Sequence, residues 1–387
     1  MRGVNFRGCI AAVLAAAAAA SCAAPLRNPV PVEFANQAMA LDGQVRQWGD
    51  EVPKNANAQI EERWAQSRAA RPSLSRAEVN FLAISGGGSD GAFGAGVLVG
   101  WTAAGNRPEF DVVTGVSTGA LAAPFAFLGP RYDDALRKVY TSYSTNDLLV
   151  ARPIRGLLGG SALANNAPLA NVIASFVDQA FLQEVAREHN RGRRLLIGTT
   201  NLDAQRPVIW DMGRIAASDH PGALDLFRKV LLASAAIPGL FPPVHVNVTA
   251  DTAREEMHVD GGTSNQVFLL PSQMMLGRQH SAKRRLYIIR NGRLKPQFQV
   301  VQARTVAIAN RSLSTLIKNQ GIGDLVQLYN FAKRNGIAYS LISIPSDFPD
   351  TSAEPFDTVY MTRLFELGFR TGQSGRSWQK VPPRLPG

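Results

Sequence analysis

A serine flanked by two glycines is the residue best placed for chemistry in this 387-residue chain. It is Ser117, in the run Gly115-Val116-Ser117-Thr118-Gly119, between an apolar stretch typical of a buried strand and small residues typical of a helix. The two glycines let a strand and a helix pass closely, and the sharp turn would expose the serine hydroxyl at a helix N-terminus. Helix dipoles favour developing negative charge there. The pattern predicts a nucleophile for an ester carbonyl; a structural turn with a capping serine is the alternative.

A glycine run about thirty residues earlier could supply hydrogen-bond donors for the same reaction. Gly86, Gly87 and Gly88 follow the apolar stretch 79–85, and a helix-like segment begins near Gly91. Without side chains, their backbone N–H groups can face a ligand directly. Loops that follow parallel strands leave a sheet at the same carboxyl edge. We therefore expect Gly86–Gly88 to form an oxyanion hole beside Ser117.

The base is harder to find, because none of the five histidines lies in a motif typical of a catalytic base. They are His189, His220, His245, His258 and His280. Asp260, in contrast, precedes Gly261 and Gly262, which permit a tight turn after a short strand. A desolvated aspartate can accept a serine proton directly. The alternative for Asp260 is an ordinary turn residue.

Four motifs together resemble the patatin-like phospholipase family. They are Gly-Gly-Gly-x-x-Gly at 86–91, Gly-x-Ser-x-Gly at 115–119, the Ser-Ala-Ala-Ile-Pro-Gly-Leu-Phe-Pro-Pro run at 234–243, and Asp-Gly-Gly at 260–262. The resemblance covers roughly residues 78–290. It implies lipid acyl hydrolysis by a Ser117–Asp260 dyad with the Gly86–Gly88 oxyanion hole, and it implies neither a metal nor a cofactor. The substrate would be a membrane lipid or another acyl ester.

One position departs from the family pattern. Many members carry Arg or Lys after the glycine run, where this chain has Asp90. Backbone donors do not depend on that side chain, so the oxyanion hole can persist. The missing cation leaves a preference for anionic headgroups in doubt.

Three other interpretations remain open. Gly86, Gly88 and Gly91 also fit a dinucleotide-binding fingerprint, with Asp111 twenty residues further on as the ribose acid. That acid should end the second strand, yet Asp111 begins it. An α/β-hydrolase would instead use a histidine after Asp260, which leaves His280 alone. Finally, the chain could be a non-catalytic lipoprotein that binds lipid in a degenerate pocket.

Alternating strand-like and helix-like segments predict an α/β fold: a three-layer α/β/α arrangement with a mostly parallel central sheet. We expect strands at 79–85, 194–201, 285–290 and 337–344. We also expect one helix at 172–187, and a helical region at 300–335 broken near Gly321.

The N-terminus reads as a targeting segment. Residues 1–21 combine two arginines with an apolar stretch too short to span a bilayer, and they end in small residues before Cys22. This predicts a bacterial signal peptide with a lipidated Cys22 and sorting to the outer membrane; ordinary cleavage would leave a periplasmic protein. Residues 22–77 would be a tether and lead-in, and residues 78–387 the hydrolase domain. The net charge of +11 suits an anionic membrane, and the absence of a nucleic-acid motif argues against nucleic acid.

Overall fold

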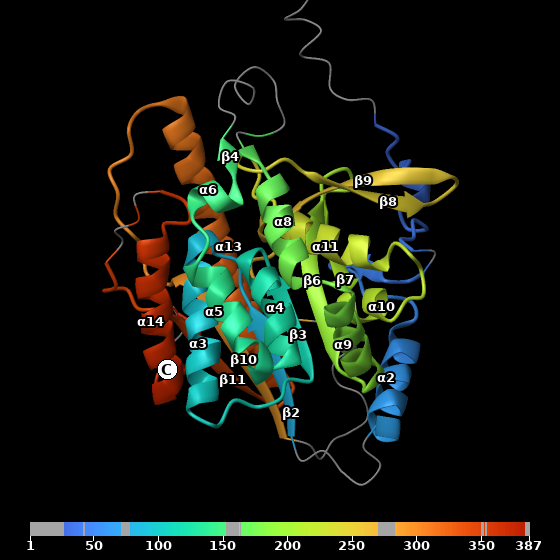
Figure 1. The fold of residues 1–387 in the computed structure, drawn as a ribbon, viewed down its shortest axis with the longest axis horizontal. Helices are drawn as coiled ribbons and strands as arrows, with labels where there is room; N and C mark the ends of the chain where they lie inside the picture. The colour runs from blue at the N-terminus through green and yellow to red at the C-terminus, as the bar shows by residue number, and fades with distance from the viewer. Residues whose placement is uncertain are drawn as a thin grey trace, which may run out of the picture.

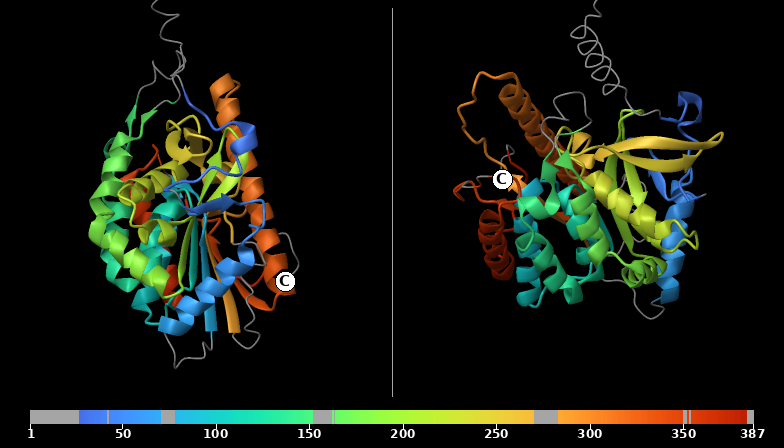
Figure 2. Two further views of the ribbon diagram at one scale, coloured as in Figure 1. Left: turned by 90° about the vertical axis from the view of Figure 1, so that its right-hand side faces the viewer. Right: turned by 45° about the horizontal axis from the view of Figure 1, so that its top comes forward.

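A nine-stranded sheet divides the molecule into two helical layers (Figures 1 and 2). The computed structural model describes residues 27–41, 43–70, 78–151, 162, 164–269, 283–349, 352 and 354–383. The predicted signal peptide, Cys22 and His280 lie outside these ranges. The main strand order is β11 (Ile337–Ile344), β10 (Lys283–Arg293), β2 (Glu78–Ile84), β3 (Val112–Val116), β6 (Arg194–Asn201), β7 (Arg206–Asp211) and β1 (Arg46–Trp48).

The central part of the sheet is parallel, as the sequence predicts. The five strands from β11 to β6 pair in parallel, whereas β7 and β1 add antiparallel strands at one edge. A hairpin of β8 (Val244–Thr249) and β9 (Ala253–Asp260) joins through β9, which pairs with β6. Two short strands, β4 (Val150–Ala151) and β5 (Ala164–Asn165), form a separate ribbon.

Side chains alternate between the two faces of the sheet, and each face has its own core. On β2, Leu82 and Ile84 join the larger apolar cluster, whereas Phe81 and Ala83 join the smaller one. The helices of the larger cluster are α3 (Gly91–Ala103), α4 (Thr118–Leu128), α5 (Asp133–Thr141), α6 (Thr145–Leu148), α8 (Ala167–Phe176), α9 (Gln179–Asn190), α10 (Met212–Ala216), α11 (Ala223–Ser234) and α14 (Thr358–Ser374). The smaller cluster lies under α13 (Thr305–Arg334) and the start of α2 (Ala56–Ala70).

Two helix predictions were wrong. The expected helix at 172–187 is divided into α8 and α9, because the Asp178 carboxylate accepts a hydrogen bond from the Phe181 N–H (2.8 Å) and so caps a new helix. The helix α13 runs unbroken through Gly321. A Cβ at Gly321 would lie 3.1 Å from the Gln266 Cβ, so the glycine allows α13 to pack closely there and does not end it.

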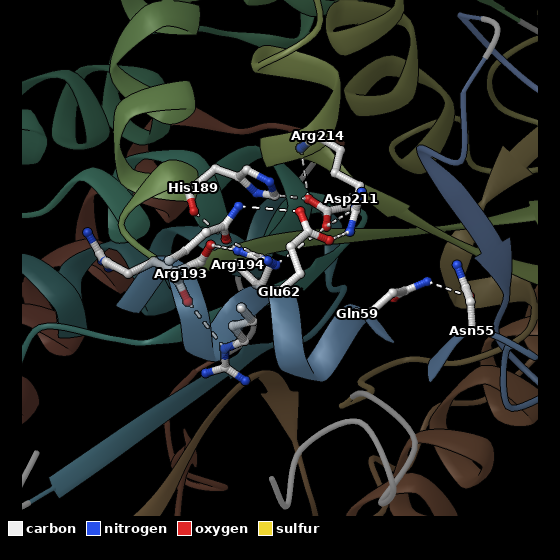
Figure 3. A network of polar contacts seen from close by, with 11 residues as sticks. Asn55, Gln59, Glu62, His189, Arg193, Arg194, Asp211 and Arg214 are labelled. Carbon is white, nitrogen blue, oxygen red and sulfur yellow. Dashed lines mark hydrogen bonds and ion pairs between the residues drawn. The ribbon is translucent and has the colours of Figure 1, made fainter. Parts of the chain in front are cut away.

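The lead-in before residue 78 is integrated into the fold. Strand β1 pairs with β7, and α2 binds the sheet edge through a polar network (Figure 3). Within it, Arg194 Nη2 donates to Gln66 Oε1 (2.9 Å), and Arg214 pairs with Glu62. The sheet therefore includes a strand from before the predicted boundary at residue 78.

Candidate active site

Ser117 lies at a strained corner between β3 and α4. Its backbone has φ 55° and ψ −127°, a left-handed conformation that a non-glycine residue rarely adopts. Two contacts support it: its N–H donates to Ser234 Oγ (3.0 Å), and Ser234 Oγ donates to the Gly198 carbonyl (2.6 Å). Ser234 is the first residue of the 234–243 motif, so this motif directly supports the corner.

The glycines around Ser117 are required by close packing. A Cβ at Gly119 would lie 2.4 Å from the Ile84 carbonyl oxygen, and one at Gly115 would lie 2.4 Å from the Gly119 carbonyl oxygen. Neither distance is possible for a real side chain. The two motif glycines therefore let α4 begin directly against the ends of β2 and β3.

Strand β6 brings Asp260 to Ser117. On one edge of β6, β3 pairs with residues up to Gly198, where Val116 is the partner. Because β7 occupies the other edge, β9 must continue along the β3 edge, and its last residue, Asp260, pairs with Thr199. The C-terminal ends of β3 and β9 therefore meet along the same edge of β6. Asp260 therefore lies next to Ser117 although 143 positions separate them in sequence.

The Asp260 carboxylate is buried beside Ser117 and has one backbone hydrogen-bond donor. Oδ1 accepts from the Gly262 N–H (2.7 Å), and the Ser117 side chain lies close enough to the carboxylate to affect its pKa. Burial raises the pKa of Asp260 to about 7, although Ser117 and the Gly262 N–H both act in the opposite direction. A carboxyl group that titrates near neutrality can take up and release a proton under ordinary conditions.

The glycine loop lies beside Ser117, but its three amides are not equivalent. A Cβ at Gly86 would lie 3.1 Å from the Ser117 Cβ, so the loop and the serine are in direct contact. The Gly86 N–H already donates to the Gln266 carbonyl (3.1 Å), which corrects the prediction that this amide serves an oxyanion. Among the described residues, the Gly87 and Gly88 amides have no such acceptor.

Polar residues at the end of β10 hold this loop, and the sequence analysis did not identify them. Arg290 Nη1 donates to Ser85 Oγ (3.0 Å) and to the Gly86 carbonyl (3.1 Å). Asn291 Nδ2 donates to the Ser85 carbonyl (2.9 Å), and its Oδ1 accepts from the Gly94 N–H (3.0 Å). Their only sequence signal was their position in the last residues of a buried strand.

Asp90 follows the glycine loop, at the position where the family resemblance leads us to expect a cation. Its carboxylate accepts a hydrogen bond from the Tyr360 hydroxyl (2.6 Å). The positive charge next to the loop belongs instead to Arg290, which is buried and interacts electrostatically with Asp90. Burial lowers the pKa of Arg290, and the nearby Asp90 and Asp324 partly offset that effect.

An apolar cavity opens beside Ser117 and is bounded by α4, α5, α8, α11 and the start of α14. None of its lining residues is charged. Its empty space, including open solvent at the mouth, is about 810 Å³. Its polar end is formed by Gly88, Ser117 and Thr118. Its apolar wall includes Leu121, Phe125, Val139, Leu169, Val172, Ile173, Phe176, Leu231, Ile237, Phe241, Phe356 and Met361.

The alternative site residues lie elsewhere. Asp111 accepts a hydrogen bond from the Asn80 N–H (2.8 Å), at the start of β2. The glycine loop follows the other end of β2, roughly 20 Å away for a seven-residue strand. Asp111 therefore cannot reach a ribose bound at the glycines.

Histidine is not part of the described site either. The histidine nearest to Asp260 in sequence is His258, which is buried. Its Nδ1 lies 2.9 Å from Thr199 Oγ1 and its Nε2 lies 3.1 Å from Glu256 Oε2. Within the described ranges, no three His, Cys, Asp or Glu side chains are grouped so that they could hold a metal ion.

Comparison with known proteins identifies the family of the central part of the chain. Residues 82–271 match the family model of patatin-like phospholipases. Two similar solved structures are VipD from Legionella pneumophila (12% identity, 79% of this chain, 68% of that chain, TM-score 0.39) and human GIVD cytosolic phospholipase A2 (11%, 82%, 56%, 0.36). The comparison with curated proteins gave no match. Residues 82–271, which carry Ser117, Asp260 and the glycine loop, form a patatin-like phospholipase domain.

Proposed function

We propose that this protein is a serine lipid acyl hydrolase, of the phospholipase A or lysophospholipase type, with a Ser117–Asp260 dyad. The observation that carries the proposal is the position of the Ser117 side chain beside the buried Asp260 carboxylate, at the mouth of an uncharged apolar cavity. A capping serine in an ordinary turn would need neither the strained backbone nor the carboxylate.

In the proposed reaction, Ser117 Oγ attacks the acyl carbonyl carbon while its proton passes to Asp260. The N–H groups of Gly87 and Gly88 donate to the oxyanion that forms, and Gly86 fixes the loop through its bond to Gln266. The ester C–O bond then breaks, and the leaving alcohol takes the proton from Asp260. Water releases the fatty acid from Ser117 by the reverse proton path.

The cavity suggests which part of the substrate is bound. Because its wall is uncharged, it suits an aliphatic chain and excludes a polar headgroup. The headgroup or glycerol would therefore remain outside the cavity. The proposed substrates are long-chain acyl esters whose carbonyl stops at the Ser117 end.

Product analysis tests the function. Mixed membrane phospholipids and lysophospholipids are incubated with the wild type and with Ser117→Ala, and released fatty acids are measured by mass spectrometry. We expect release by the wild type alone, and covalent labelling of Ser117 by a fluorophosphonate. A folded wild-type protein that binds lipid but neither releases fatty acid nor takes up the label would instead be a lipid-binding protein.

Filling the cavity should change chain-length preference. Ile173 is buried in its wall, so Ile173→Trp should lower kcat/KM for a palmitoyl ester about tenfold or more and leave a butyryl ester within about twofold, since a lost hydrophobic subsite affects only the long chain. Ser175→Trp, on the exposed side of the same helix, is the control. Equal losses on both esters would contradict binding of the chain in this cavity.

We also propose export as a lipoprotein anchored through Cys22, with a periplasmic protein as the alternative. The proposal is based on the charge and apolar pattern of residues 1–21. Labelling with radioactive palmitate in a bacterial host, compared with Cys22→Ser, tests it, and a protein that remains unlabelled would contradict it.

A further inference from the structure

A long segment between β10 and the buried part of α13 stands clear of the rest of the molecule. We name residues 294–320 the protruding segment; it comprises the loop 294–304 and the first turns of α13, drawn in orange in Figure 1. Among its described side chains, none is buried. Sixteen helical residues, 305–320, correspond to a length of about 24 Å.

The protruding segment rises from the edge of the sheet that carries the active site. Strand β10 is parallel to β2, so the loop that follows it leaves at the same carboxyl edge as the glycine loop. Where α13 returns to the body, a Cβ at Gly321 would lie 3.2 Å from Arg290 Nη2, the guanidinium behind that loop. Figure 1 shows the first turns of α13 at the same end of the molecule as β4 and α6.

Large apolar side chains of this segment face solvent. Phe298 is 95% exposed, Val300 81%, Leu316 67% and Ile308 51%. A soluble surface carries single exposed apolar residues, but four in one unpartnered segment mark an interaction surface. The chain offers no cover for them in the described structure.

The charge of the segment indicates what it contacts. It contains Lys295, Arg304, Arg311 and Lys318, and neither Asp nor Glu occurs between Arg293 and Asp324. Arg311 donates to the Gln297 carbonyl (2.5 Å) and Lys318 donates to the Lys295 carbonyl, so uncharged acceptors bind them and the positive charge persists. Partial burial lowers the pKa of Lys318, and the positive charges of Arg290 and Arg311 act in the same direction.

We propose that the protruding segment docks the protein onto an anionic lipid bilayer, with its apolar side chains in the interface and its cations near the headgroups. Exposed aromatic and aliphatic residues with Lys and Arg among them suit an anionic bilayer surface, because the apolar groups leave water and the cations attract anionic headgroups. No helix among the described residues is long and apolar enough to cross a bilayer. Docking here would place the carboxyl edge of the sheet, and with it the cavity mouth, toward the lipid.

Vesicle sedimentation tests the docking without turnover. The full chain carries Ser117→Ala, to prevent lipid consumption, and Cys22→Ser, to prevent acylation. Vesicles of pure phosphatidylcholine are compared with vesicles containing 30% phosphatidylglycerol, at low and high salt. We expect stronger binding to the anionic vesicles, and that difference should decrease with salt because exposed charges are screened.

Variants of the segment give the decisive comparison. Lys295→Glu with Arg304→Glu should weaken partition to anionic vesicles about 25-fold or more, since each lost cation accounts for about fivefold and the new carboxylates are repelled. Phe298→Glu with Leu316→Glu should weaken partition to both kinds of vesicle. Arg68→Glu and Val52→Glu, at exposed positions of α2 and of the loop before it, are the matched controls.

Two results would overturn the proposal. One is equal binding by segment variants and controls, with unchanged thermal midpoints that show all are folded. The other is loss of self-association, measured by analytical ultracentrifugation, without loss of vesicle binding, which would make the segment an interface between two copies. Because Ser117→Ala is present throughout, neither result depends on the proposed catalysis.

Discussion

Replacing Ser117 by alanine is expected to lower kcat for lipid ester hydrolysis by ~10,000-fold or more, because no other group can form the acyl intermediate. The protein should remain folded, since the side chain faces the cavity mouth and the backbone support comes from Ser234. Steady-state kinetics on a lysophospholipid and a thermal melt measure both properties. Ser175→Ala, a surface serine on α8, is the control and should behave as the wild type.

Ser117→Gly separates the effect of the lost hydroxyl on kcat from the effect of backbone strain on stability. With φ at 55°, Ser117 has an unfavourable backbone that glycine adopts freely. Ser117→Gly should therefore be as inactive as Ser117→Ala but more stable than it, by about 1 kcal/mol. A Ser117→Ala protein that retains more than about a tenth of the wild-type kcat would eliminate the nucleophile proposal.

The second large effect is expected at Asp260. Asp260→Asn retains the shape and can still accept from the Gly262 N–H, but it cannot take the proton of Ser117. We expect kcat/KM to fall ~1,000-fold or more, as losses of a catalytic base do. In the wild type, kcat/KM should rise with pH to a plateau above a midpoint near 7, because only ionised Asp260 can act as the base.

His280→Ala is the companion variant, because His280 is the histidine that follows Asp260 in the sequence. It should leave kcat/KM and its pH profile unchanged. If His280→Ala abolishes turnover in a folded protein, a Ser–Asp–His triad replaces the dyad. A flat wild-type profile between pH 5 and 9 would also contradict a carboxylate base with a raised pKa.

The same pKa shift has a consequence for stability. The folded protein retains the Asp260 proton up to about pH 7, whereas the unfolded chain releases it near 3.8. The unfolded state therefore binds fewer protons between these values, and the contribution of Asp260 to stability decreases as pH rises from about 4 to 7. Asp260→Asn should remove this loss, so the variant should gain stability relative to the wild type over that range, as denaturant titrations at pH 4.5 and 8 would measure.

Sequence patterns were sufficient to predict the long strands of the sheet but not the short strand β1 at its edge. Strands β6 and β11 were predicted because each is a long apolar run bounded by turn residues, which local pattern reveals. Strand β1 was missed because three residues carry no measurable period, and only pairing with β7 defines it. The continuity of α13 through Gly321 depends on packing against Gln266, which the sequence of the helix does not contain.

The sequence by itself determined which residues could react: the spacing of Gly115, Ser117 and Gly119, the glycine run and the Asp260 turn are local features of the chain. Only the tertiary structure decided that Ser117 and Asp260 meet, because that depends on two strands ending at adjacent residues of β6. It also decided that the Gly86 amide is already occupied and that Arg290 supports the loop. Contacts between residues distant in sequence produce no local sequence pattern. They form only when the sheet brings its strands together, so the sequence alone could not predict them.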